Sequence, residues 1–157
     1  MKNSSEITKY RHRIHELFSE ERLDGIEAVI HNPALKSNND RVDAILDLLK
    51  DMEISMIGAG TNRMSILKDE YIYKIALDAL GKQDNWTEFN MSVELQPYVT
   101  KTYECNGIIA VAEYVNLFSK EEFELSKENI NAMLEILAED YLFCDLGTST
   151  KNWCNYG

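Results

Sequence analysis

Histidine and cysteine are the residue types that most readily bind transition metals or act as nucleophiles. His12 and His15 lie three residues apart in a stretch with helical periodicity, a spacing that allows two imidazoles to reach one metal ion. His31 is the only other histidine, and no cysteine or suitably spaced set of carboxylates completes a site. We therefore expect no metal site at these residues.

The cysteines are Cys105, Cys144 and Cys154, an odd number with no CxxC spacing. This pattern predicts reduced thiols in a cytoplasm rather than a disulfide framework. No histidine is placed to activate any of these cysteines as a nucleophile. We therefore expect the thiols to be buried and unreactive. The amino terminus lacks the apolar core of a signal peptide, which agrees with a cytoplasmic location.

The charge of the chain is strongly acidic. Its 157 residues, enough for about one domain, include 16 basic and 27 acidic residues, a net charge of −11. Such a field repels nucleic acid and membranes and attracts basic surfaces. Residues 103–145 hold ten carboxylates against two lysines. Two interpretations stay open: a solvated face that aids solubility, or a binding face for a basic partner.

The first third of the chain has helical periodicity. Residues 6–31 and residues of about 40–50 repeat apolar side chains at helix spacing. Between them, Asn32-Pro33 marks a break, and the polar residues 37–40 offer several helix caps. We expect residues 1–52 to form a helical amino-terminal segment.

The period then changes to that of β-strands. Met56–Leu67 predicts a strand, a glycine turn and a second strand, and Tyr71–Leu77 predicts a third. Gly81–Asn85 is expected to be a loop, followed by a helix near Trp86–Gln96 that ends at Pro97.

The remaining elements are a hairpin, a long helix and a tail. Val99–Cys105 and Ile108–Val115 predict two strands joined at Asn106-Gly107, a strong hairpin signal. Ser119 begins a long amphipathic helix, with Glu122 at the capping-box position. The tail after Cys144 is expected to be a loop. This order predicts an α+β fold with an antiparallel sheet of about five strands and packed helices. We expect the chain to form one compact unit.

The order of these elements resembles a protein-kinase-like fold: strand, glycine turn, strand, third-strand lysine, helix with glutamate, hairpin, long helix and an Asp–Asn loop. Three segments resemble kinase-like proteins from phages of Gram-positive bacteria, over about residues 53–157. The resemblance implies the amino-terminal lobe of a kinase or aminoglycoside phosphotransferase and the start of the second lobe. The segments are 57–63, 73–78 and 145–148, the last together with 152–157.

The resemblance implies a nucleotide site. Gly58 and Gly60 would cover the phosphates of ATP, Lys74 would hold phosphate oxygens, and Glu88 would pair with Lys74. Glu94 is the other carboxylate available for that pairing. Read without the resemblance, the two glycines form a hairpin turn and Lys74 is a strand lysine at a solvent edge.

The resemblance also implies Asp145 as catalytic base and Asn152 as metal-binding asparagine, although both also suit turns. The sequence departs from the kinase pattern in three places. Arg63 replaces the third glycine, Asn152 follows Asp145 by seven residues rather than five, and the chain ends at Gly157 before the aspartate that would bind magnesium. We therefore expect no kinase activity from this chain alone, and favour a naturally short protein over a truncated fragment.

Three functions compete at this point. The preferred one is a non-catalytic phage or prophage protein in the bacterial cytoplasm that blocks a basic nucleic-acid-handling host target, such as RNA polymerase or a CRISPR nuclease complex. The alternatives are a nucleotide-binding phosphotransferase fragment and a pseudokinase, either of which would bind ATP with magnesium. An apolar face left by half a bilobal fold would favour a partner or a homodimer. The carboxylates expected to contact a basic partner are Glu121, Glu122, Glu124 and Glu128.

Overall fold

The structure, a computed structural model, describes residues 13–96, 99–116 and 119–137 of the chain. The chain divides into two compact units, Met1–Tyr114 and Val115–Gly157. The first unit holds a sheet and four described helices, and the second holds one described helix. The predicted boundary near residue 52 stays a prediction.

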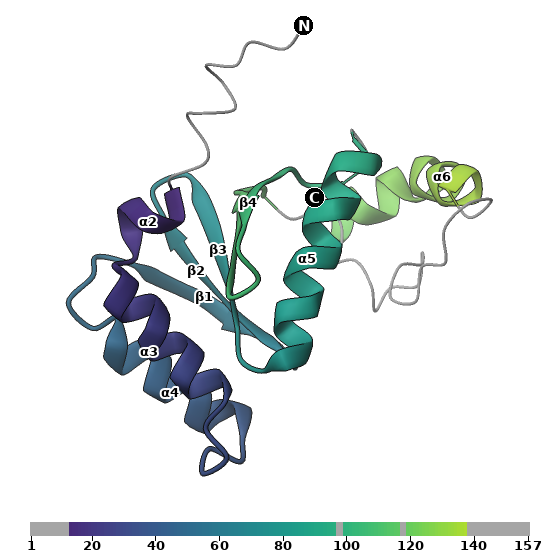
Figure 1. The fold of residues 1–157 in the computed structure, drawn as a ribbon. Helices are drawn as coiled ribbons and strands as arrows, with labels where there is room; N and C mark the ends of the chain where they lie inside the picture. Colours follow the sequence, from purple (N-terminus) through teal and green to yellow (C-terminus); the bar gives the residue numbers. More distant parts are fainter. Residues whose placement is uncertain (1–12, 97–98, 117–118, 138–157) are drawn as a thin grey trace, which may run out of the picture. The chain divides into compact units, whose positions relative to one another are not determined.

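A five-stranded antiparallel sheet forms the centre of the first unit (Figure 1). Its strands follow the order β1-β2-β3-β5-β4, and every neighbouring pair is antiparallel. The predicted α+β class with an antiparallel sheet is therefore confirmed. The strands are β1 Ser55–Ala59, β2 Arg63–Lys68, β3 Tyr71–Ala76, β4 Thr102–Cys105 and β5 Ile109–Glu113.

Among the described residues, three helices precede the sheet: α2 (Arg13–Leu17), α3 (Glu20–Ile30) and α4 (Asn38–Leu48). Ser19 interrupts the predicted helical stretch because its hydroxyl caps α3, accepting a hydrogen bond from a backbone amide in the first turn. Ser37 begins α4 with a complete capping box. Short polar side chains thus fix where α3 and α4 begin.

These helices pack on one face of the sheet through a shared apolar core. Side chains alternate between the two faces along each strand, so Tyr73 and Ile75 lie on the core face while Lys74 lies on the other. Figure 1 shows α3 and α4 on one side of the sheet and α5 on the other. The largest fully buried core residues of this layer include Ile14, Phe18, Ile26, Ile45, Leu49, Met64 and Ile66.

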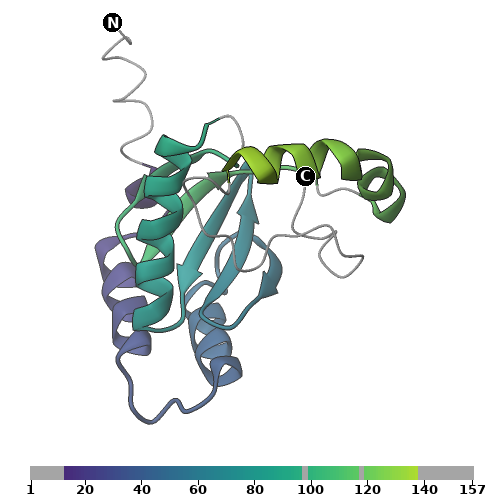
Figure 2. The same cartoon turned by 90° about the vertical axis from the view of Figure 1, so that its right-hand side faces the viewer.

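Helix α5 (Ala79–Glu94) lies on the opposite face of the sheet (Figure 2). The predicted loop at Gly81–Asn85 is wrong, because the helix begins at the N-cap Asp78, whose carboxylate accepts a hydrogen bond from the Gly81 amide at 2.8 Å. A Cβ on Gly81 would lie 2.1 Å from the carbonyl oxygen of Asn62. Glycine is therefore needed at position 81 for close packing against the β1–β2 turn, not for a loop.

The predicted hairpin at Asn106-Gly107 is confirmed. Gly107 has a φ of +87°, a conformation that glycine adopts without steric cost. The Asn106 side chain accepts a hydrogen bond from the Ile109 amide at 2.8 Å, which closes the turn between β4 and β5. Trp86 of α5 lies against this turn, since its indole nitrogen is 2.9 Å from the place of a Cβ on Gly107.

The second unit contains helix α6 (Lys120–Leu137). Its predicted capping box is confirmed: the Ser119 hydroxyl accepts from the Glu122 amide at 3.2 Å, and the Glu122 carboxylate accepts from the Ser119 amide at 2.7 Å. Across the described ranges, no helix has the length and apolar content needed to cross a membrane.

Candidate functional site

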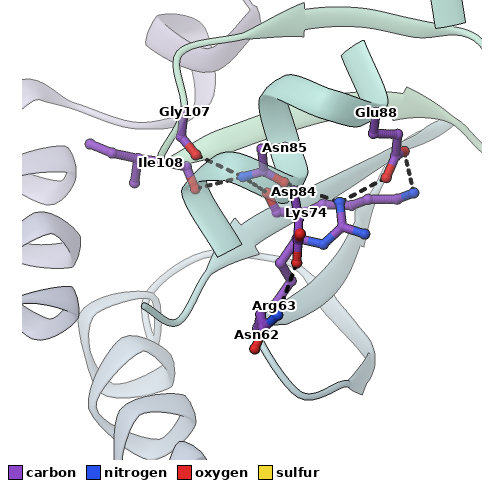
Figure 3. A network of polar contacts seen from close by, with 8 residues as sticks. All are labelled: Asn62, Arg63, Lys74, Asp84, Asn85, Glu88, Gly107 and Ile108. Carbon is purple, nitrogen blue, oxygen red and sulfur yellow. Dashed lines mark hydrogen bonds and ion pairs between the residues drawn. The ribbon is translucent and has the colours of Figure 1, made fainter. Parts of the chain in front are cut away.

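The side chains of Lys74 and Glu88 form an ion pair between the sheet and α5 (Figure 3). Lys74 lies in the middle of β3, opposite Ser65 of β2 and Ala110 of β5. Its small neighbours leave room for the lysine to extend along the sheet toward the helix. The two side chains are 25% and 23% exposed, so the pair is partly shielded from water.

Arg63, the first residue of β2, is a second cation on the same glutamate. Its Nη1 lies 2.7 Å from Oε2 of Glu88, while Lys74 contacts Oε1. Burial opposes the ionisation of Glu88, but the charges of Lys74 and Arg63 outweigh it and hold the pKa of this carboxyl below its usual value. Glu88 is therefore a carboxylate at neutral pH and orients both cations.

Asn85, one helical turn before Glu88, fastens α5 to the sheet. It is fully buried, and its side-chain amide donates to the carbonyl oxygens of Gly107 at 2.8 Å and of Lys74 and Ile108 at 3.2 Å each. Its carbonyl oxygen accepts from Arg63 at 3.3 Å. The backbone of Lys74 and the guanidinium of Arg63 are thus held by the same side chain.

A pocket of about 300 Å³ opens beside this network, under the turn between β1 and β2. The side-chain amide of Asn62, in the turn, donates a hydrogen bond to the carboxylate of Asp84 on α5 at 3.0 Å (Figure 3). This bond joins the turn to the helix. The turn is also supported from α4, where the Asn38 amide donates to the carbonyl oxygen of Thr61. The pocket is polar, and its lining includes Gly60, Thr61, Asn62, Arg63, Lys74 and Asp84.

Gly60 lines the pocket, and Gly58 lies in β1 opposite the pocket residue Ser65. The fold does not require glycine at either position. Neither has a positive φ, and a Cβ on Gly58 would meet no atom within 4 Å. A Cβ on Gly60 would make only an ordinary contact, 3.8 Å from the Arg63 carbonyl oxygen. The missing side chains leave open space through which a ligand can approach the backbone.

The resemblance to kinases implies magnesium bound together with a nucleotide, and magnesium requires oxygen ligands. Magnesium is often held by one or two carboxylates together with substrate phosphates. Asp84 is the carboxylate that lines the pocket, and it has no ion-pair partner among the described residues. The described residues contain no group of three or more metal-ligating side chains. Asp84 therefore fits an ion that arrives bound to phosphate, but not an ion held by protein alone.

The other residues singled out in the sequence are placed as follows. Lys74 pairs with Glu88 and not with Glu94. Asp145 and Asn152, the expected catalytic base and metal-binding asparagine, lie outside the described residues. The Cys105 thiol is partly buried, and burial raises its pKa above the ordinary value of 9.0, so it is protonated at neutral pH.

The histidines make local contacts in the described part of the chain. His15 lies 3.1 Å from a carboxylate oxygen of Glu20, and His31 lies 3.0 Å from one of Glu27. Both pairs are on or beside helix surfaces. His12, like Cys144 and Cys154, lies outside the described residues.

The four glutamates expected to bind a partner are all exposed on α6. Glu122 is engaged in the helix cap, and Glu124 lies 3.5 Å from Lys127. Glu121 and Glu128 have no cation within ion-pair distance among the described residues. The helix thus presents a surface of carboxylates with little local neutralisation.

Sequence reasoning missed two members of the network, Arg63 and Asn85. The sequence pattern identifies Arg63 only as the replacement of a third glycine, and it predicts a loop at Asn85. A helix begun at Asp78 instead of Trp86 would have placed Asn85 and Glu88 on one face, three residues apart. The cap at Asp78 was the available signal.

Comparison with known proteins gives no further guide, because no family model, curated protein or solved structure matches this chain. The chemistry of the site is therefore argued from its own geometry.

Proposed function

We propose that the sheet and α5 form a nucleotide-binding lobe of kinase-like type, in which Lys74 binds phosphate oxygens of ATP carried with magnesium. The observation that carries the proposal is the Lys74–Glu88 ion pair beside a polar pocket under a glycine-containing turn. A lysine of the third strand paired with a glutamate of the following helix is the phosphate-binding arrangement of protein kinases.

The chemistry of the pair suits an anion. Glu88 fixes the position of the ammonium group, so the ordering of a flexible lysine does not have to accompany binding. Partial burial lowers the effective dielectric around the pair, which strengthens the attraction to a phosphate oxygen compared with an exposed lysine. Open space at Gly58 and Gly60 lets phosphates come close to the backbone of the turn.

The order of the elements also supports a kinase-like lobe, since strand, glycine turn, strand, lysine strand, helix and hairpin follow one another as the resemblance implies. The proposal covers nucleotide binding. Phosphoryl transfer is not included, because it would require the roles of Asp145 and Asn152, which lie outside the described residues.

The test is a thermal unfolding titration with ATP and magnesium on the wild type, Lys74→Ala and Lys68→Ala. Lys68 is a matched control, since it is a half-buried lysine on β2 away from the pocket. A ligand at a hundredfold excess over its Kd stabilises by about 2.7 kcal/mol, which raises Tm by roughly 5–10 °C.

We expect this shift in the wild type and in Lys68→Ala, and none in Lys74→Ala. An equal shift in all three proteins would place the nucleotide elsewhere. No shift in the wild type would remove the proposal.

A second candidate function rests on α6. We propose that its exposed glutamates contact a basic nucleic-acid-handling protein of a bacterial host, as a phage-derived antagonist would. The supporting observations are the net charge of −11 and the exposure of all four side chains. Carboxylates compete well for channels that bind phosphate backbones.

The test uses purified bacterial RNA polymerase and a CRISPR nuclease complex in a surface-binding assay at two salt concentrations. We expect tight binding to one of them that weakens steeply with salt. Replacement of Glu121, Glu124 and Glu128 by lysine should abolish it, while Glu122 is kept to preserve the helix cap. Unchanged binding by the triple variant, or no binding to either target, would contradict this candidate.

A further inference from the structure

Two cations share one carboxylate at the candidate site. Lys74 and Arg63 donate to different oxygens of Glu88, and the two oxygens of a carboxylate are direct neighbours. The ammonium and guanidinium groups therefore lie close together at one wall of the pocket. The three side chains carry a net charge of +1.

Arg63 has donors to spare. A guanidinium carries five N–H groups, and the described contacts of Arg63 use Nη1 alone, for Glu88 and Asn85. The side chain is 28% exposed and lines the pocket together with Lys74. Its fork geometry suits the oxygens of a phosphate, which it can contact in bidentate fashion.

We propose that Arg63 and Lys74 together form a subsite for two adjacent phosphates, so that the site selects nucleoside di- and triphosphates over monophosphates. This inference rests on the proposed nucleotide-binding function and names Arg63 as its specificity-determining residue. One phosphate is bound by Lys74 and its neighbour by Arg63. Glu88 keeps the two cations at a spacing that linked phosphates can span.

A purely structural Arg63 would behave differently. If the guanidinium served only to anchor Glu88, its loss would weaken all ligands of Lys74 to the same degree. A phosphate-binding Arg63 acts only on ligands that have a second phosphate. The distinction is therefore a difference between ligands and not a loss of overall affinity.

The experiment is isothermal titration calorimetry with ATP, ADP, AMP and inorganic pyrophosphate on the wild type, Lys74→Ala, Arg63→Ala and Arg63→Lys. Arg22→Ala is the matched control, because Arg22 is also 28% exposed and ion-paired, with Asp51, away from the pocket. Circular dichroism checks that each variant is folded. Arg63→Lys retains the charge without the fork, and it keeps the test decisive if Arg63→Ala does not fold.

We expect the wild type to bind ATP, ADP and pyrophosphate at least tenfold more tightly than AMP. Arg63→Ala should weaken the first three roughly tenfold to a hundredfold, as for the loss of a charged hydrogen bond, and change AMP affinity less than about twofold. The affinities of Arg63→Lys should lie between those of the wild type and Arg63→Ala. Arg22→Ala should bind all four ligands as the wild type does.

Two outcomes overturn the inference and separate it from the proposed function. Lys74-dependent binding that Arg63→Ala leaves unchanged, or weakens equally for AMP and ADP, removes the diphosphate subsite and leaves nucleotide binding in place. Absence of Lys74-dependent binding of any of the four ligands removes both.

Discussion

Asn85 of α5 donates its side-chain amide to the carbonyl oxygen of Gly107, 2.8 Å away in the turn between β4 and β5. This bond ties the helix that carries Glu88 to a turn contributed by a different part of the chain. Because Asn85 and Glu88 are three residues apart on one helix, the same bond sets the height of Glu88 above the sheet. The lysine–glutamate pair is therefore positioned by a buried amide.

Replacing Asn85 should loosen the whole network. In Asn85→Ala, the carbonyl oxygens of Lys74, Gly107 and Ile108 lose their buried donor, and we expect the free energy of unfolding to fall by about 1–3 kcal/mol. Urea unfolding followed by circular dichroism measures this change. Asn90→Ala, at an exposed position of the same helix, is the control and should stay within about 0.5 kcal/mol. Equal losses in both variants would contradict the anchoring role.

The charge on Glu88 should make stability depend on pH. Its folded pKa lies below the ordinary value of 4.5, so the unfolded chain binds a proton more readily than the folded one. The contribution of Glu88 is then fully present above about pH 4.5 and is lost as the pH falls through the folded pKa.

In Glu88→Gln, the two cations lose their carboxylate at every pH. We expect the free energy of unfolding to be about 1–3 kcal/mol lower than that of the wild type at pH 7, and the difference to shrink below pH 4.5. Urea unfolding across pH 3–7 gives the comparison. A difference that is constant with pH would show that the ionisation of Glu88 does not contribute to stability.

Alanine substitutions at Gly81 and Gly58 should distinguish an effect on packing from an effect on ligand binding. Gly81→Ala places a Cβ against the Asn62 carbonyl oxygen, so we expect a loss of about 1–3 kcal/mol in unfolding free energy. Gly58→Ala meets no neighbour, so its stability should equal or exceed that of the wild type while its affinity for ATP falls. Thermal unfolding with and without ATP and magnesium tests both. Unaltered ATP affinity in Gly58→Ala would show that the ligand does not pass over this glycine.

Much of the fold could be predicted from local patterns. The hairpin at Asn106-Gly107 and the capping box at Ser119 were found because short-range backbone chemistry determines them. The sequence predicts the start of α5 too late because Gly81 is a poor helix former. The Asp78 cap begins the helix, and the close contact with Asn62 explains why glycine occupies position 81. That contact is between segments far apart in sequence, so no local pattern contains it.

In the candidate site, too, some features follow from the sequence pattern and others depend on tertiary contacts. The pairing of Lys74 with Glu88 followed from the resemblance, and the structure brings these two side chains together. The addition of Arg63 depends on how β2 enters the sheet beside α5, which is a tertiary relationship. A sequence pattern identifies Arg63 as a replaced glycine, whereas its side chain in the folded protein adds a charge to the pocket.

Asp84 lines the pocket and has no ion-pair partner among the described residues. Without magnesium, Asp84 repels phosphate, so Asp84→Asn should bind ATP more tightly than the wild type in EDTA. With magnesium, the carboxylate gains an ion to share with the phosphates, so Asp84→Asn should bind more weakly than the wild type. Calorimetric titrations in both buffers should therefore show effects of opposite sign.

The reversal depends on the carboxylate and not on the shape of the side chain, because asparagine is nearly isosteric with aspartate and can still accept the hydrogen bond from Asn62. Asp78→Asn, at the N-cap of the same helix and away from the pocket lining, is the control and should leave the effect of magnesium unchanged. If Asp84→Asn strengthened ATP binding in both buffers, Asp84 would only repel phosphate, and the magnesium ion would be held by phosphate and water alone.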